Sequence, residues 1–227
     1  MSKTLVLFDI DGTLLDTRGA GRRSFARAIG HVFGGDDDLM DITFAGATDL
    51  DLFEKIARRK GRAASDGERR EFFGVLPGLL RDELKEEAPH VYPGVIELLN
   101  DLSGRPQITL GLVTGNMESC ATIKLEACGI HHRFVLGAFG HEHADRRELA
   151  RLARRRAEER GAFEHCALIG DTPSDIIAAK EIGAVSIAVA TGGYSIGQLA
   201  EAGAQVVWTN LLQYFENEFQ SLFENTP

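Results

Sequence analysis

The stretch TLVLFDIDGT, residues 4–13, lies close to the start of the chain. Thr4–Phe8 is almost entirely apolar, which predicts a strand that is covered on both of its faces. Asp9 follows this run directly, and Asp11 and Gly12 come shortly after it. In an open parallel sheet, ligands bind beyond the carboxyl ends of the strands. The stretch therefore predicts a buried parallel strand with an acidic site at its end.

Further apolar runs of the same kind are expected as strands: Ile108–Val113, Cys166–Ile169, Val185–Ala190 and Gln205–Trp208, with Phe134–Phe139 as an additional candidate. Between them, apolar residues recur at helical spacing, as in Val95, Leu98 and Leu102. Strands that alternate with helices are typical of an α/β fold in which helices cover both faces of a parallel sheet.

The segment from about Arg18 to Ala88 breaks this alternation, because it has helical spacing throughout and no clear strand. We predict a helical domain at residues 18–88, inserted after the first strand into a core domain of residues 1–17 and 89–227. Pro77 lies inside the last helical pattern and is expected to kink or split that helix.

Composition narrows the possible partners. The net charge of −9 over 227 residues disfavours nucleic acid and anionic membranes. We found neither a signal-peptide pattern nor an apolar run long enough to span a membrane. Three cysteines without a CxxC pair argue against a disulfide framework or a zinc site, and favour a reducing cytoplasm.

Three polar clusters follow three of the predicted strands: DIDGT at 9–13, TGN at 114–116 and GDTPSD at 170–175. We expect them to meet at the carboxyl edge of the sheet. A carboxylate that attacks a phosphate dianion is repelled by roughly 4 kcal/mol per pair of unit charges at 4 Å and an effective dielectric constant near 20. Mg²⁺ removes this obstacle, and it prefers the oxygen ligands that Asp9, Asp171 and Asp175 offer.

Each cluster also has groups for phosphoryl transfer. Asp9 can act as the nucleophile, and Asp11 can protonate the leaving oxygen and later activate water. Thr114 and the Gly115 amide can hold the phosphoryl oxygens, and Gly12 permits a sharp turn. The predicted residues in these clusters are, for phosphate, Gly12, Thr114, Gly115 and Asn116, and, for metal, Asp9, Asp11, Asp171 and Asp175.

These motifs, together with their spacing, resemble those of a known family. DIDGTLLD (9–16), VTGN (113–116) and IGDTPSD (169–175) are similar to the first, second and fourth motifs of the haloacid dehalogenase superfamily. The likeness is strongest to its phosphoglycolate phosphatase-like branch, which has a helical (C1-type) cap after the first strand. The resemblance implies a Rossmann-like core, Mg²⁺, and a monomer or homodimer that acts on a small phosphorylated substrate.

The resemblance also implies roles for individual residues. Asp9 would be the nucleophile and Asp11 the acid/base. Asp171 would bind the metal directly, and Asp175 directly or through water. It also places substrate-facing loops of the cap near Arg22, Arg23 and Phe44–Thr48, although such residues are more often structural.

One motif of the family differs in this chain. The lysine that usually neutralises the phosphate and the nucleophile, often followed by proline, is absent. Lys124 lies about ten residues beyond Thr114, roughly 15 Å along a helix, which predicts that it is too far away, and Lys180 is similarly remote from Asp171. Arg146 is the predicted substitute and Arg147 the second candidate, since arginine keeps the charge and can grip a phosphate with two nitrogens.

Several alternatives share the fold. A dehalogenase is disfavoured because that activity, in this family, lacks an acid like Asp11. A sugar phosphomutase would need a cap that restrains water. A phosphonatase would need a cap lysine for a Schiff base, for which Lys55 and Lys60 are candidates. A non-catalytic binding protein on this fold is favoured only by the altered lysine motif.

Overall fold

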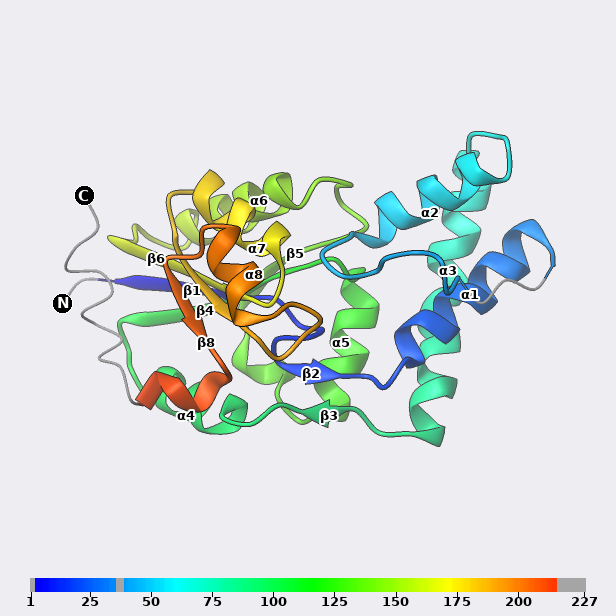
Figure 1. The fold of residues 1–227 in the computed structure, drawn as a ribbon. Coiled ribbons are helices and arrows are strands. Elements are labelled where there is room, and N and C mark those ends of the chain that lie inside the picture. The colour runs from blue at the N-terminus through cyan, green and yellow to red at the C-terminus, as the bar shows by residue number, and fades with distance from the viewer. Residues whose placement is uncertain (1–2, 36–38, 216–227) are drawn as a thin grey trace.

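The computed structural model describes residues 3–35 and 39–215. Six strands form one parallel sheet in the order β5-β4-β1-β6-β7-β8 (Figure 1). Their bounds are β1 Thr4–Phe8, β4 Ile108–Thr114, β5 Leu136–Phe139, β6 His165–Gly170, β7 Val185–Val189 and β8 Val206–Trp208. All six strands expected from the sequence are present, with ends shifted by two residues or fewer, so the predicted α/β sheet is confirmed.

The strand β1 lies inside the sheet, between β4 and β6. Its last residue, Phe8, is in register with Leu112 of β4 and Ile169 of β6. The residues that follow the three strands are therefore level with one another at one edge of the sheet. This register explains why clusters more than a hundred residues apart in the sequence meet.

Helices cover both faces of the sheet. One face packs on α4 (Val95–Ser103), α5 (Glu118–Ala127) and the short helix η2 (Leu211–Phe215). The other face packs on α6 (Arg146–Glu158) and α7 (Pro173–Glu181). Alternate residues of β1 enter the two cores, with Val6 on the first face and Leu7 on the second. Because both faces of the strand are buried, nearly all of its residues are apolar.

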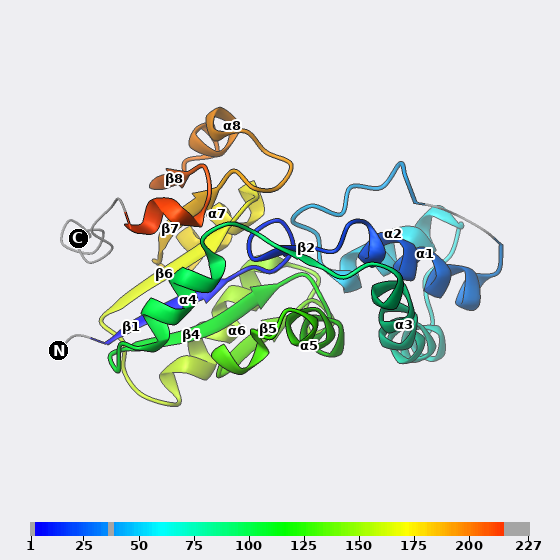
Figure 2. The same cartoon turned by 90° about the horizontal axis from the view of Figure 1, so that it is seen from below.

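Three helices, α1 (Ala20–Phe33), α2 (Asp49–Arg59) and α3 (Asp66–Glu86), form what we call the helical unit. It lies beyond the carboxyl ends of β1 and β4 (Figures 1 and 2). Its apolar residues pack in one cluster with Met117, which precedes α5, and with Cys120 and Ile123 of α5. The helical unit therefore sits on α5 and over the edge of the sheet where the acidic residues lie.

Some details differ from expectation. The short strands β2 (Leu15–Asp16) and β3 (His90–Val91) pair antiparallel where the chain enters and leaves the helical unit, and they were not predicted. Pro77 does not split α3, which runs unbroken from Asp66 to Glu86. Buried Phe72, Leu76 and Leu80 hold this helix against the unit's core on both sides of the proline. The domain boundaries at 17/18 and 88/89 stay a prediction.

The remaining elements are short. They are α8 (Ile196–Glu201), which packs on β8, and the short helix η1 (His131–Arg133) after α5. Within the residues described, we find no helix that is long and apolar enough to cross a membrane.

Candidate active site

Three buried aspartates meet at the carboxyl edge of the sheet. Asp9 follows β1, Asp171 follows β6, and Asp175 lies in the first turn of α7. One carboxylate oxygen from each lies within 4.8 Å of the other two. The sequence predicted this meeting, and an all-carboxylate set of ligands is the kind that hard divalent cations such as Mg²⁺ prefer.

The loop after β1 approaches Asp171 closely. Gly12 has a φ of +81°, and a Cβ atom at this position would collide with the Asp171 carboxylate. Gly192 meets the same carboxylate from the loop after β7. Thr191 of that loop donates a hydrogen bond to the Gly12 carbonyl at 2.5 Å. Two glycines are therefore needed to bring two backbone segments against Asp171.

Asp175 is held from two sides. Its Oδ2 accepts hydrogen bonds from the Thr172 amide at 3.0 Å and the Thr172 hydroxyl at 2.6 Å, which caps the start of α7. Its Oδ1 faces Nε of Arg146 at 3.0 Å. The sequence GDTPSD thus encodes both the helix start and an acidic side chain that points at the site.

The three carboxylates are crowded. Burial raises the pKa of Asp9 to about 7, with Arg146 opposing the shift and Asp175 and Asp11 adding to it. Burial and the neighbouring Asp9 and Asp175 charges likewise raise the pKa of Asp171 well above its usual range. Like charges in a dry site disfavour ionisation, and a bound divalent cation would relieve this repulsion.

Arg146 is the cation that contacts this cluster. Its side chain is 5% exposed, and Nη2 lies 2.5 Å from Asp9 Oδ1 while also donating to the Val113 carbonyl at 3.2 Å. Arg147 is instead exposed and paired with its neighbour Asp145, and Lys180 is exposed and donates to the Ala202 carbonyl. Of the two arginines considered, the structure brings Arg146 to Asp9 and leaves Arg147 outside the cluster.

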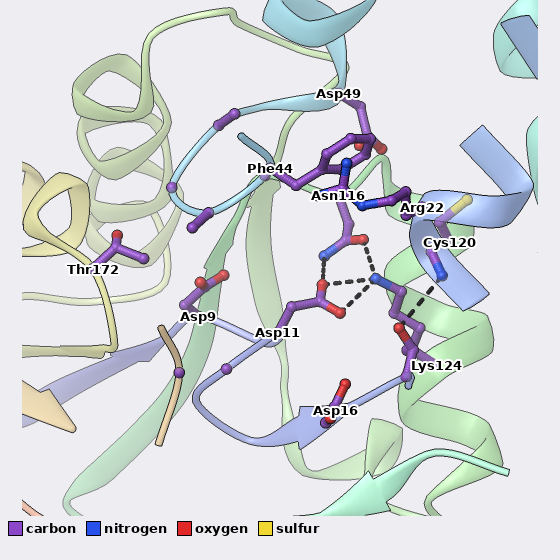
Figure 3. Close-up of a pocket in the computed structure, with 18 of the residues that line it drawn as sticks. Asp9, Asp11, Asp16, Arg22, Phe44, Asp49, Asn116, Cys120, Lys124 and Thr172 are labelled. Atoms are coloured by element: carbon purple, nitrogen blue, oxygen red, sulfur yellow. Dashed lines mark hydrogen bonds and ion pairs between the residues drawn. The ribbon is translucent and has the colours of Figure 1, made fainter. Parts of the chain in front are cut away.

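Asp11 does not join the three clustered aspartates. Its carboxylate turns toward Asn116 and Lys124 (Figure 3), with Lys124 Nζ at 2.8 Å and 2.7 Å from its two oxygens. The side-chain amide of Asn116 donates to the same carboxylate at 2.7 Å. The predicted Asp11 side chain is therefore at the site but is held by an ammonium and an amide.

The sequence estimate judged Lys124 too far from the phosphate and the nucleophile, and it did not predict the contact of Lys124 with Asp11 or its place in the lining of the cavity. The distance along a helix was counted from Thr114, but α5 begins only at Glu118 and passes beside the loop that carries Asp11. A lysine stem also adds its own reach. The signal was in the pattern, because Lys124 falls among buried residues of α5, between Ile123 and Leu125.

The TGN cluster lies between these groups. Thr114 is fully buried, and its hydroxyl accepts hydrogen bonds from the Asn116 amide at 3.2 Å and from the Asn116 side chain at 2.8 Å. Gly115 and Asn116 line the cavity, as does Gly12. The structure thus brings the predicted phosphate-binding residues to one place, with Thr114 just behind the surface.

A cavity of about 420 Å³ opens over this edge of the sheet. The edge of the sheet and α5 contribute Asp9, Asp11, Asp171, Arg146 and Lys124. Figure 3 shows Asp9, Asp11 and Lys124 on this side. The helical unit and its loops contribute a mostly apolar side, formed by Phe25, Phe44, Leu52, Leu76 and Leu80, together with Arg22. A phosphate at Asp9 would therefore have its ester group facing the helical unit.

Residues 47–50 attach the helical unit to the loops of the site. The Asp49 amide donates to the Gly115 carbonyl at 2.8 Å, and the Leu50 amide donates to the Gly140 carbonyl at 3.0 Å. The Asp49 carboxylate accepts from the Met117 amide at 2.7 Å. Burial raises the pKa of Asp49 to about 6, although the Met117 amide and Lys124 lower it. This contact closes the cavity on one side.

Arg22 lines the cavity, whereas Arg23 does not. The Arg22 guanidinium lies 4.4 Å from the centre of the Phe44 ring and donates to the carbonyls of Leu39 and Ile42, the latter at 3.0 Å. Arg23 is exposed and paired with Glu83 at 2.7 Å. Of these two neighbouring arginines, only Arg22 can meet a ligand in the cavity.

The two lysines considered for a Schiff base lie elsewhere. Lys55 is 59% exposed and pairs with Asp51, and Lys60 is exposed at the end of α2. Neither lines the cavity. Lys124 does line the cavity. Burial lowers the pKa of Lys124, but the neighbouring Asp11 and Asp49 charges outweigh burial and raise it, so the ammonium stays charged. A charged ammonium is not a nucleophile.

The chain is similar in sequence to known phosphatases. Residues 6–189 match the family model of haloacid dehalogenase-like hydrolases. The chain belongs to this family. A probable phosphatase, IndB, from Dickeya dadantii is 31% identical over 90% of this chain and 89% of that protein. A phosphoglycolate phosphatase from Agrobacterium fabrum is 28% identical over 89% and 87% of the two chains.

Solved structures agree on the fold. A hydrolase from Pseudomonas syringae has a TM-score of 0.72 and 21% identity, and the match covers 96% of this chain and 97% of that one. At this identity the likeness concerns the fold alone. Together these matches confirm the haloacid dehalogenase resemblance, its phosphoglycolate phosphatase-like branch, and the expected class of enzyme, a hydrolase of the phosphatase type.

Proposed function

We propose that the protein is a Mg²⁺-dependent phosphatase that hydrolyses a small phosphorylated metabolite through an aspartyl-phosphate on Asp9. The observation that carries this proposal is the Asp9 carboxylate itself. It lies at the floor of the cavity, within 4.8 Å of two further carboxylates and 2.5 Å from a buried arginine. The phosphatase relatives support the same reaction.

Asp9, Asp171 and Asp175 would hold the metal ion, which fits the crowding of their charges. The ion supplies positive charge that lets a carboxylate approach a phosphate dianion. Arg146 adds a second cation on the Asp9 side and would bind the phosphoryl oxygens together with the Gly115 backbone and Asn116, while Thr114 supports the Asn116 side chain from behind the cavity surface. Asp11, two residues after the nucleophile, would protonate the leaving oxygen and then activate water.

The helical unit would act as the cap. It supplies the apolar side of the cavity and is attached to the site through residues 47–50. A closed cap excludes bulk water from the phosphoryl group and surrounds the leaving group. We place the reaction in a reducing cytoplasm, with which three free cysteines in the described chain are consistent. A monomer or homodimer is proposed from the family resemblance.

Phosphate release from p-nitrophenyl phosphate tests the class of reaction. We expect release to require Mg²⁺ and to stop with a chelator. Asp171→Asn should lower kcat/KM by about 10²-fold or more, since it removes a charged ligand from the cluster. Asp66→Asn, at a side chain that is 85% exposed, is the control and should behave as wild type. Release that is equally fast with chelator would contradict the metal proposal.

Arg22 leads to a prediction about the leaving group. No acidic side chain between residues 3 and 35 or 39 and 215 pairs with this guanidinium, which faces the cavity. Together with the phosphoglycolate phosphatase relatives, this favours a leaving group that carries a carboxylate.

Two esters of similar size test this preference, namely 2-phosphoglycolate and 2-hydroxyethyl phosphate, whose leaving group is uncharged. Arg22→Gln should lower kcat/KM for the first by about 10- to 100-fold, as expected for a lost charged hydrogen bond, and change the second by less than about 3-fold. Arg23→Gln is the matched control. Equal losses on both esters would show that Arg22 does not recognise the carboxylate of the leaving group.

A further inference from the structure

Lys124 is a buried charge for which the proposed reaction has no direct use. Its side chain is 5% exposed, and it lies on α5, a helix of the core domain. An ammonium has three N–H donors. Here Nζ contacts the two oxygens of Asp11 at 2.8 Å and 2.7 Å and Oδ1 of Asn116 at 2.6 Å. All three donors are used, so none is left for a substrate.

Asn116 extends this contact into a network. Its amide nitrogen donates to Asp11 at 2.7 Å and to the Thr114 hydroxyl at 2.8 Å, while its oxygen accepts from Lys124. The Asp11 carboxylate is therefore held by donors from both the loop after β4 and α5. Its side chain is still 42% exposed, and it opens into the cavity. Asp11 thus has a fixed direction and a free side.

The same helix seats the helical unit. Cys120 and Ile123 of α5, together with Met117 just before the helix, pack into the apolar core of that unit. Gly21, in the first turn of α1, lies directly over Lys124, and a Cβ atom at this position would be 3.5 Å from Nζ. Lys124 is thus located where the cap rests on the core, and it connects that seat to Asp11.

Removing the ammonium would leave Asp11 with one donor, the Asn116 amide. A carboxylate side chain that loses two charged hydrogen bonds gains rotational freedom, and a small displacement of a reacting group is costly in catalysis. Asp9 and Asp171 would keep their contacts, because neither has a contact with Lys124 among the described interactions. Asn116 would lose the hydrogen bond that its oxygen accepts from Lys124 but would keep the two that its side-chain nitrogen donates to Asp11 and Thr114.

We infer that Lys124 is a positioning residue, which holds the Asp11 carboxylate toward the leaving-group side of the cavity and couples its direction to the seat of the cap. This inference rests on the proposed function, in which Asp11 protonates the leaving oxygen. Lys124 acts through Asp11 and does not touch the phosphoryl group.

The dependence on the leaving group tests this inference. The value of kcat/KM reports the steps up to departure of the leaving group, before the phosphoenzyme breaks down. p-Nitrophenolate departs without a proton, whereas an alkoxide needs one. Lys124→Met should therefore lower kcat/KM for an alkyl ester, such as propyl phosphate, by about 10- to 100-fold more than for p-nitrophenyl phosphate. Asp11→Asn should show the same asymmetry with a larger loss.

Three further variants make the result decisive. Lys124→Arg keeps the charge and should restore a ratio between the two esters closer to wild type. Lys180→Met removes an exposed lysine from α7 and should change neither ester. Should Lys124→Met fail to fold, as judged by circular dichroism, Lys124→Gln takes its place and should show the same asymmetry.

Equal losses on both esters, or no loss on either, would overturn the positioning role of Lys124. Failure of the proposed function has a different signature, because wild type would then show no Mg²⁺-dependent release from either ester. A variant that loses activity on both esters and also its thermal stability would identify Lys124 as a purely structural residue.

Discussion

Asp9→Asn is expected to lower kcat/KM for p-nitrophenyl phosphate by about 10⁴-fold or more, the scale seen when a nucleophile is removed. An amide does not form the acyl phosphate that the proposed mechanism needs. The change also removes one oxygen ligand from the acidic cluster. Steady-state assays with purified protein and a saturating concentration of Mg²⁺ measure this loss.

The fold should survive this substitution. Asparagine has the size of aspartate, and burial already disfavours the charged form of Asp9, whose pKa is raised to about 7. We therefore expect a melting temperature without metal that is at least as high as that of wild type. Turnover equal to wild type would mean that another residue attacks the phosphate, or that a contaminating phosphatase produced the activity.

Arg146→Met should lower kcat/KM by about 10²- to 10³-fold, because one cation that faces both the nucleophile and the phosphate is lost. Arg146→Lys should recover only part of this activity. A single ammonium cannot reach Asp9 and Asp175 at once in the way that Nη2 and Nε of the arginine do, at 2.5 Å and 3.0 Å. Measuring kcat/KM for the two variants at several Mg²⁺ concentrations tests this order.

A matched control lies next to Arg146 in the sequence. Arg147→Met removes an exposed arginine whose partner is Asp145, and it should retain wild-type kcat/KM. Arg146→Met should also melt at a lower temperature than Arg147→Met, since it leaves buried carboxylates without a counter-charge. If Arg147→Met had the larger effect on activity, the assignment of Arg146 would be wrong.

Much of the fold could be predicted because β1 and its neighbouring strands are buried on both faces and therefore consist mostly of apolar residues. Val6 and Leu7 face opposite cores, so Thr4–Phe8 is apolar at every position after Thr4 and is visible in the sequence. The polar residues that follow these strands then mark the carboxyl edge. The register of Phe8 with Leu112 and Ile169 makes these clusters coincide.

Other features depend on tertiary contacts that leave little local signal. The pairing of β2 with β3 involves two residues on each side, too few for a visible alternation. Pro77 stands in an unbroken helix because the apolar contacts on both sides of it outweigh the loss of one hydrogen bond.

The sequence predicted Arg146, whose charge and place in the chain both indicated a role at the site. It missed the contact of Lys124 with Asp11, which depends on where α5 lies in three dimensions. Arg146 begins α6 and reaches Asp9, as its position after β5 indicates. Lys124 was dismissed by a distance counted along the helix, although α5 lies beside the Asp11 loop. A lone lysine on the buried side of a helix was the clue, since burying such a charge without a partner is costly.

Acid quenching during turnover, followed by mass spectrometry of the peptides, tests whether Asp9 is the nucleophile. We expect a phosphoryl adduct on Asp9 that forms with Mg²⁺, is labile to hydroxylamine and is absent from Asp9→Asn. An adduct on another residue would contradict it. So would rapid turnover of an alkyl phosphate with no adduct on Asp9 in quenches from the pre-steady state to steady state.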